Sequence, residues 1–138
     1  MDCLFCKIIN GEIPSTKVYE DDLVVAFMDI SQITDGHTLV VPKQHFTNFL
    51  DINSNVLAHL NIVAQKIAQA MMKSLDGIKG INIINNCGEK AGQVVMHYHL
   101  HLIPRYDNDG FSINHLDNSN NINFDKLAKL AKSINSNI

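Results

Sequence analysis

Runs of basic residues and long apolar stretches are both missing from this sequence, and each absence argues against a class of protein. Its 138 residues include 11 basic and 14 acidic side chains, for a formal net charge of -3, and lysine and arginine form no cluster. A groove for nucleic acid therefore has little support, whereas a small nucleotide needs only a local pocket. No apolar stretch approaches the roughly 18 residues of a membrane span. We expect neither a nucleic acid nor a membrane as a partner.

Cysteine is scarce, and its pattern argues against a secreted protein. The three cysteines are odd in number, and two of them, Cys3 and Cys6, form a C-x-x-C motif. The first nine residues lack the basic segment and apolar core of a signal peptide. We therefore interpret the cysteines as reduced thiols and expect a cytoplasmic protein. The C-x-x-C motif is half of a typical zinc site, with a redox pair or two idle thiols as alternatives.

Hydrophobic periodicity predicts one domain with five strands and two helices. Apolar and β-branched segments predict strands at residues 18–20, 23–28, 37–41, 81–84 and 96–104. Apolar residues recur every three or four positions over 53–72 and 124–134, which is typical of amphipathic helices, with Asn53 or Ser54 and Asn123 as caps. We expect an α+β fold, a five-stranded, mostly antiparallel sheet with one long helix and a short C-terminal helix.

Three histidines alternate in the last predicted strand: His97, His99 and His101. Side chains two apart on a strand share a face and lie about 6.6 Å apart. The three imidazoles would thus form a row able to act on one phosphate-sized group or to ligate neighbouring metals. Polar side chains satisfied on a solvent face are the third interpretation. The strict alternation, with apolar residues on the opposite face, favours the two functional interpretations.

The segment HYHLHLI at residues 97–103 resembles the signature of the histidine triad (HIT) superfamily. Segments at 4–14, 25–30, 36–45 and 91–93 are similar to the other landmarks of the family, in the same order and at similar spacings. The resemblance covers about residues 2–106 and is strongest to the small bacterial-type members of the Hint-like branch. It implies a single HIT domain over 1–138, with a core at about 2–106 and a C-terminal extension at about 107–138.

The resemblance implies covalent catalysis by the central histidine. His99 would attack the α-phosphorus of a nucleotide and form a nucleotidyl-histidine, which water then cleaves. Its other ring nitrogen would donate to a backbone carbonyl on the same strand. His101 would hydrogen-bond the phosphate; related nucleotidyltransferases have glutamine there, so a histidine favours a hydrolase. His37 matches a family histidine that supports the triad from behind.

The resemblance also implies a nucleotide pocket. Phe5, Ile8, Phe27 and Ile30 would sandwich the base, and Asp29 would accept both ribose hydroxyls; core packing and a solvated strand end are the alternatives. Asn86 and Gln93 would reach the phosphate or leaving group, and Gly92 would let the backbone approach, with a turn as the alternative role. Val94 stands where eukaryotic Hint-like proteins have a serine, which removes a donor near the leaving group.

The first triad histidine has a second implied role in a zinc site. Some family members complete the C-x-x-C pair with two histidines that match His45 and His97 here, so the implied ligands are Cys3, Cys6, His45 and His97. Such a structural zinc would pin the amino terminus against the sheet. His59 is expected to be exposed and without a role.

The sequence thus predicts a nucleotide hydrolase that acts on purine nucleotide derivatives, such as adenosine phosphoramidates or diadenosine tetraphosphate. The alternatives are a nucleotide-binding regulatory module with incidental hydrolysis, a nucleotidyltransferase, and a purely zinc-dependent protein. A homodimer is expected, because the family joins two protomers into one continuous sheet with a site in each.

Overall fold

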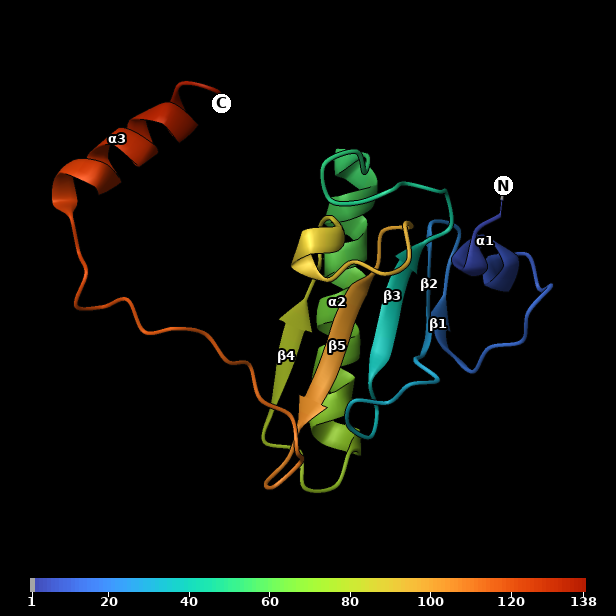
Figure 1. Cartoon of the computed structure of the whole chain (residues 1–138). Helices are drawn as coiled ribbons and strands as arrows, with labels where there is room; N and C mark the ends of the chain where they lie inside the picture. Colours follow the sequence, from blue (N-terminus) through green and yellow to red (C-terminus); the bar gives the residue numbers. More distant parts are fainter. Residues whose placement is uncertain (1) are drawn as a thin grey trace.

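The computed structural model describes residues 2–138 and shows a five-stranded antiparallel sheet (Figure 1). The strands lie in the order β1-β2-β3-β5-β4, and their bounds are Lys17–Glu20, Val24–Met28, Thr38–Pro42, Leu100–Arg105 and Gly80–Ile84 in that order. The helices are α1 (Leu4–Ile9), α2 (Ser54–Ser74) and α3 (Phe124–Asn135), with a short 3-10 helix η1 (Glu89–Ala91). The predicted α+β fold is confirmed.

The long helix α2 covers one face of the sheet. Asn53 caps it, because its side-chain oxygen accepts from the backbone N–H groups of Asn55 and Val56. The buried stripe of the helix, Leu60, Val63, Ala64, Ile67 and Met71, packs against Val24, Val40, Leu100 and Leu102 from the sheet. This cluster is the main core, and it leaves the opposite face of the sheet free for the site.

The other face of the sheet is covered at one end by α1, a helix that the periodicity did not predict. Phe5 is buried there against Val25, Phe27, Leu39 and Val41. With only six residues, α1 has too few turns to produce a repeating apolar stripe. Its start is fixed by the sulfur of Cys3, which accepts from the backbone N–H of Cys6 at 3.5 Å.

The last strand begins four residues later than predicted. Residues 95–97 form a bend, and β5 pairs with β3 only from Leu100 onward, opposite Val40. The bend is held by the backbone N–H of Tyr98, which donates to the carbonyl of Phe46 at 2.7 Å. Only His101 therefore lies in the regular strand, and the expectation of one uniform row of three histidines is wrong.

After β5 the chain leaves the domain as an extended arm that ends in α3 (Figure 1). Side chains beyond Phe111 are all exposed. The C-terminal helix begins where predicted, because the side chain of Asn123 accepts from the backbone N–H of Lys126. Among residues 2–138, no helix has the combination of length and apolar character that crossing a membrane requires.

Candidate active site

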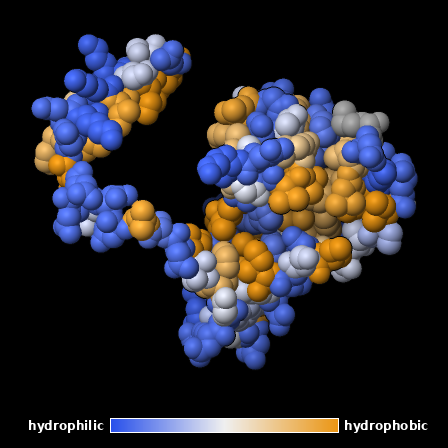
Figure 2. All heavy atoms as spheres, viewed as in Figure 1, coloured by the Kyte–Doolittle hydropathy of each residue, from blue (hydrophilic) through white to orange (hydrophobic). Residues whose placement is uncertain are grey.

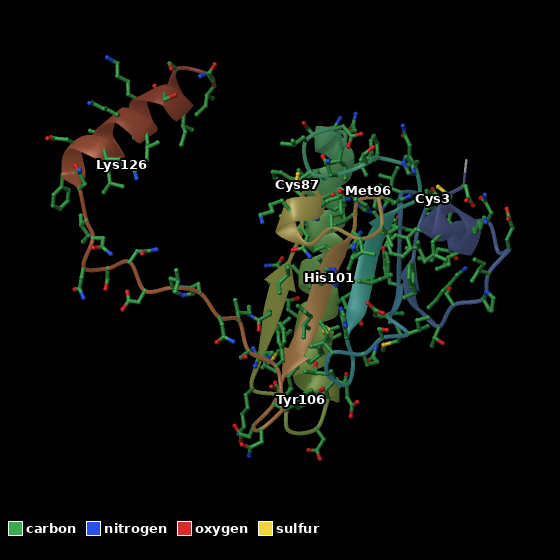
Figure 3. All side chains as sticks on the ribbon, viewed as in Figure 1. Cys3, Cys87, Met96, His101, Tyr106 and Lys126 are labelled. Atoms are coloured by element: carbon green, nitrogen blue, oxygen red, sulfur yellow. The ribbon has the colours of Figure 1, made fainter. Side chains whose placement is uncertain are left out.

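The side chains of the three histidines point in two directions around the bend. The rings of His99 and His101 lie 5.0 Å apart between centroids, and both line the same cavity. The ring of His97 is fully buried and lies instead beside the ring of His45, at 4.8 Å. Figure 3 shows His101 on β5 in the middle of the sheet, with Cys3 beside α1.

The hydrogen bond at Nδ1 of His99 fixes which ring nitrogen is free to react. Nδ1 lies 2.7 Å from the carbonyl oxygen of His97, within a buried site. A carbonyl can only accept, so Nδ1 carries the proton and Nε2 keeps its lone pair. Burial lowers the pKa of His99, which favours the neutral ring. The result is a neutral imidazole with an available nucleophilic nitrogen.

A second chain of hydrogen bonds fixes the proton on His101. The backbone N–H of Ile33 donates to Nδ1 of His37 at 3.2 Å, so the proton of the neutral His37 ring is on Nε2. That nitrogen lies 2.9 Å from Nδ1 of His101 and donates to it. His101 is therefore left with its own proton on Nε2, as a donor. Burial, followed by the neighbouring His99 and His37 rings, lowers the pKa of His101 to about 4.

A cavity of about 500 Å³ opens beside His99 and His101, a size within the usual range for small-molecule sites. Its lining is mainly apolar and includes most of the residues that the sequence predicted: Phe5, Ile8, Phe27, Asp29, Ile30, Asn86, Gly92 and Val94. Sequence reasoning missed a further wall of the cavity, Ile13, Pro14 and Ser15. These three residues belong to the loop between α1 and β1, which has no periodic pattern.

Asp29 stands at the rim of this cavity, where β2 ends. One carboxylate oxygen accepts from the backbone N–H of Ser31 at 2.8 Å, and the other lies 3.6 Å from Nε2 of His37. Ile30, next to it, is 99% exposed, so its side chain can contact a ligand only at the edge of the cavity. The loop behind them is braced by Gln32, whose amide nitrogen donates to the carbonyls of Asp29 and His37.

Gln93, which the sequence analysis expects to reach the phosphate or leaving group, instead makes hydrogen bonds within the protein. It is 3% exposed and does not line the cavity. Its amide oxygen accepts from the backbone N–H of Gly88, and its amide nitrogen donates to the carbonyls of Thr47 and Val95. In this structure Gln93 therefore shapes the loop, whereas its neighbour Val94 is 87% exposed at the cavity.

Four potential metal ligands meet on the other side of the bend, in agreement with the predicted grouping of Cys3, Cys6, His45 and His97. The Nδ1 atom of His97 lies 3.5 Å from the sulfur of Cys3, 3.6 Å from that of Cys6 and 3.1 Å from Nδ1 of His45. Tetrahedral zinc with usual bond lengths requires sulfur–nitrogen separations of about 3.6 Å and nitrogen–nitrogen separations of about 3.3 Å. The four groups thus fit a zinc ion.

The hydrogen bonding of His97 suits this metal site. Its Nε2 lies 2.8 Å from the carbonyl oxygen of Pro42, so the proton is on Nε2 and the lone pair of Nδ1 faces the sulfurs. Burial lowers the pKa of His97 to about 4, which keeps the ring neutral, as a metal ligand must be. The same residue therefore orients His99 through its backbone and faces the metal cluster through its ring.

One histidine outside the site also has a partner that was not expected. His59 on α2 is half-buried, and its Nε2 lies 2.7 Å from a carboxylate oxygen of Asp21. The same carboxylate closes the turn between β1 and β2 by accepting from the N–H groups of Leu23 and Val24. The expectation that His59 is exposed and without a role is wrong.

The fold and site define a small α+β protein with a histidine-centred site on an antiparallel sheet. A family model described as HIT domain matches residues 10–108. The chain belongs to the HIT family, a superfamily of nucleotide-binding proteins and hydrolases.

Among curated proteins, the Protein hit of Bacillus subtilis is 53% identical over 80% of this chain and 76% of its own length. The Adenylylsulfatase HINT3 of Arabidopsis thaliana is 39% identical over 78% of this chain and 54% of its own.

Solved structures match most or all of the chain. A HIT family protein from Bacillus subtilis has 45% identity and a TM-score of 0.93 over 100% of this chain and 98% of its own. One from Bacillus anthracis has 46% identity and a TM-score of 0.92 over 99% and 97%. A Zn-bound histidine triad family protein from Mycobacterium smegmatis has 39% identity and a TM-score of 0.77 over 84% of each chain.

The buried neutral histidines predict that the fold loses stability in weak acid. Burial lowers the pKa values of His99 and His101 below about 6.5, the value in an unfolded chain, so the unfolded state binds more protons as pH falls. We expect the free energy of unfolding to fall as pH drops from about 6.5 towards 4. Urea denaturation followed by circular dichroism measures it.

The matched variants for this prediction are His101→Gln and His115→Gln. The first removes a half-buried ring with a lowered pKa and should flatten the pH dependence of the unfolding free energy, whereas the second changes an exposed residue of the arm and should leave that dependence unaltered. Equal unfolding free energies at pH 7 and pH 5 in the unaltered chain would contradict the assignment of neutral buried rings.

Proposed function

We propose that this protein is a nucleotide hydrolase that cleaves purine nucleotide derivatives at the α-phosphorus through a covalent intermediate on His99. The observation that carries the proposal is the free lone pair on Nε2 of His99, set by the carbonyl of His97, in a ring that lines the cavity. His101 lines the same cavity, with a proton on its Nε2. A nucleophile and a hydrogen-bond donor thus stand side by side.

The first step forms a bond between Nε2 of His99 and the α-phosphorus and breaks the bond to the leaving group, which departs with its electron pair. The Nε2–H of His101 donates to the phosphate and stabilises its developing charge. The positive charge that His99 gains is met by the carbonyl of His97, which accepts from Nδ1–H. Water then attacks the phosphorus, and the bond to Nε2 breaks with its electron pair returning to the ring, which becomes neutral again. A nucleoside monophosphate is released, and the proton lost by the water passes to the solvent.

The shape of the cavity supports a nucleoside as the bound group. Phe5 and Phe27 meet edge to face with centroids 5.6 Å apart, next to Ile8, and offer an apolar surface for a flat base. The carboxylate of Asp29 lies at the same opening and can accept two ribose hydroxyls. Adenosine phosphoramidates and dinucleoside polyphosphates both contain the required α-phosphorus. Val94 offers no proton to an amine leaving group, so the polyphosphates are the better matched of the two.

A structural zinc ion is the second part of the proposal. The residues that would hold it are Cys3, Cys6, His45 and His97, whose separations fit a tetrahedral site, and a Zn-bound relative supports it. A closed four-ligand site has no open position, so zinc would supply rigidity and no chemistry. It would hold α1 and the bend next to His99.

A homodimer is the third part, and the two edges of the sheet differ in a way that supports it. The edge strand β1 has exposed charged residues, Lys17 and Glu20, and a shift in register, features that prevent pairing with another chain. The opposite edge strand β4 is uncharged and exposes Ile83. We propose that two protomers join along β4 into one continuous sheet.

The catalytic proposal predicts that His99→Ala loses at least about 10³-fold in turnover, because the nucleophile is gone. Adenosine phosphoramidate and diadenosine tetraphosphate are assayed side by side, and mass spectrometry of the acid-quenched protein detects the nucleotidyl adduct. His59→Ala is the matched control, since His59 lies on α2, which covers the opposite face of the sheet. An active His99→Ala variant would contradict the mechanism. Tight binding of nucleotide without turnover by the unaltered chain would indicate a regulatory binding module.

The zinc proposal predicts one zinc ion per chain after dialysis, measured by elemental mass spectrometry. Cys3→Ser should lose the metal and lower the melting temperature, because one of four ligands is weakened. Cys87→Ser should keep it, since Cys87 is a free cysteine outside the cluster. Zinc retained by Cys3→Ser, or absent from the unaltered chain, would rule out this site.

A further inference from the structure

The C-terminal helix α3 presents an apolar stripe that no other part of residues 2–138 covers. Its four large apolar residues, Phe124, Leu127, Leu130 and Ile134, are 78%, 52%, 49% and 66% exposed. Across residues 2–138, each hydrogen bond made beyond residue 111 joins neighbours within the arm or α3. A 12-residue helix is marginal by itself in water and gains stability by packing its apolar face. The stripe therefore needs a partner surface.

The direction in which the arm leaves the domain is fixed by Arg105. Its guanidinium bonds Asn82 on β4 at 2.6 Å, the carboxylate of Asp109 at 2.8 Å and 3.1 Å, and the carbonyl of Phe111 at 2.6 Å. It also stacks over the ring of Phe111. The arm thus starts from a rigid anchor on the β4 side of the sheet, the side of the edge strand that is open for pairing.

Two solved relatives show that the position of α3 is a shared feature. Residues 107–138 are nearly a quarter of the chain. TM-scores of 0.93 and 0.92 over 98% and 97% of the Bacillus subtilis and Bacillus anthracis chains require the arm and α3 to superpose as well as the domain. A helix that touches nothing in its own chain keeps one position only if something else holds it.

The stripe faces the space beside β4. In Figure 2 the apolar atoms of α3 lie along the side turned toward the rest of the molecule, across an open space. Charge favours a second copy as the occupant of that space. Residues 124–138 contain three lysines and one aspartate, whereas the remainder of the chain has 13 acidic and 8 basic residues.

We propose that α3 packs its apolar stripe on a second copy of this chain, so that the two protomers exchange their C-terminal arms. The inference rests on the dimer proposed above, in which β4 of each protomer meets at the shared edge. After exchange, the apolar stripe of each α3 meets the partner protomer on the β4 side, toward which Arg105 directs the arm. This contact adds an interface to the one formed by the two β4 strands. The exchanged arms then stabilise the dimer.

The direct test places a photoreactive benzoylphenylalanine at Phe124 of the full chain, which begins α3 and is the most exposed of its four large apolar residues. Illumination followed by a denaturing gel should give a covalent dimer. The same group at Lys129, on the lysine-bearing face, is the control and should give little or none. Sedimentation of the same samples reports the oligomeric state independently.

The results of the test distinguish arm exchange from the β4 dimer. A cross-link only within one chain, or none while the protein sediments as a dimer, overturns arm exchange and leaves the β4 dimer standing. A chain that sediments as a monomer overturns both. As a second measurement, the pair Leu127→Ser and Leu130→Ser should raise the dimer dissociation constant roughly tenfold or more. Ser133→Ala changes an exposed, uncharged residue of the same helix outside the apolar stripe and should leave the constant nearly unchanged. An unchanged constant in the leucine pair contradicts the inference.

Discussion

The hydrogen bond from Nδ1 of His99 to the carbonyl oxygen of His97 is the contact on which the rest of the site depends. It is 2.7 Å long and buried, and it decides which nitrogen of His99 holds the lone pair. The bond exists because residues 95–99 lie outside the sheet, which leaves the carbonyl of His97 free to accept from the following histidine ring. A regular strand over the same residues would have used that carbonyl for pairing. The late start of β5 thus leaves the carbonyl of His97 available to His99.

His97 ties this contact to the amino terminus. Its carbonyl orients His99, while its Nε2 donates to Pro42 and directs Nδ1 at Cys3, Cys6 and His45. A metal held by these groups would fix both α1 and the bend. Phe5 on α1 lies 5.0 Å from the ring of His99, so the helix that carries the cysteines also forms a wall of the cavity. The proposed nucleophile and the proposed metal centre are therefore joined through His97 and α1.

The sequence predicted the elements that carry a repeating pattern. The long stripe of α2, the β1–β2 hairpin and the caps at Asn53 and Asn123 all follow from local side-chain chemistry, and the structure confirms them. The short helix α1 was missed because six residues give no period. The bend at 95–97 was missed because the chain after it is held by the carbonyl of Phe46, which is distant in sequence. The sequence expected Gln93 to reach the phosphate or leaving group. Its buried position could not be predicted, because it depends on a distant partner, the carbonyl of Thr47. The candidate site residues were found through their resemblance to a family and not through periodicity.

The most direct test of this account is the tautomer of His99, observed by nitrogen-15 NMR of the imidazole rings at neutral pH. Long-range nitrogen–proton correlations distinguish a ring protonated on Nδ1 from one protonated on Nε2. The account predicts a neutral His99 with the proton on Nδ1 and a bare Nε2, and the opposite pattern for His101 and His97, which carry the proton on Nε2. A His99 ring that is protonated on Nε2, or on both nitrogens, would contradict it, because the proposed nucleophile would then have no lone pair to use.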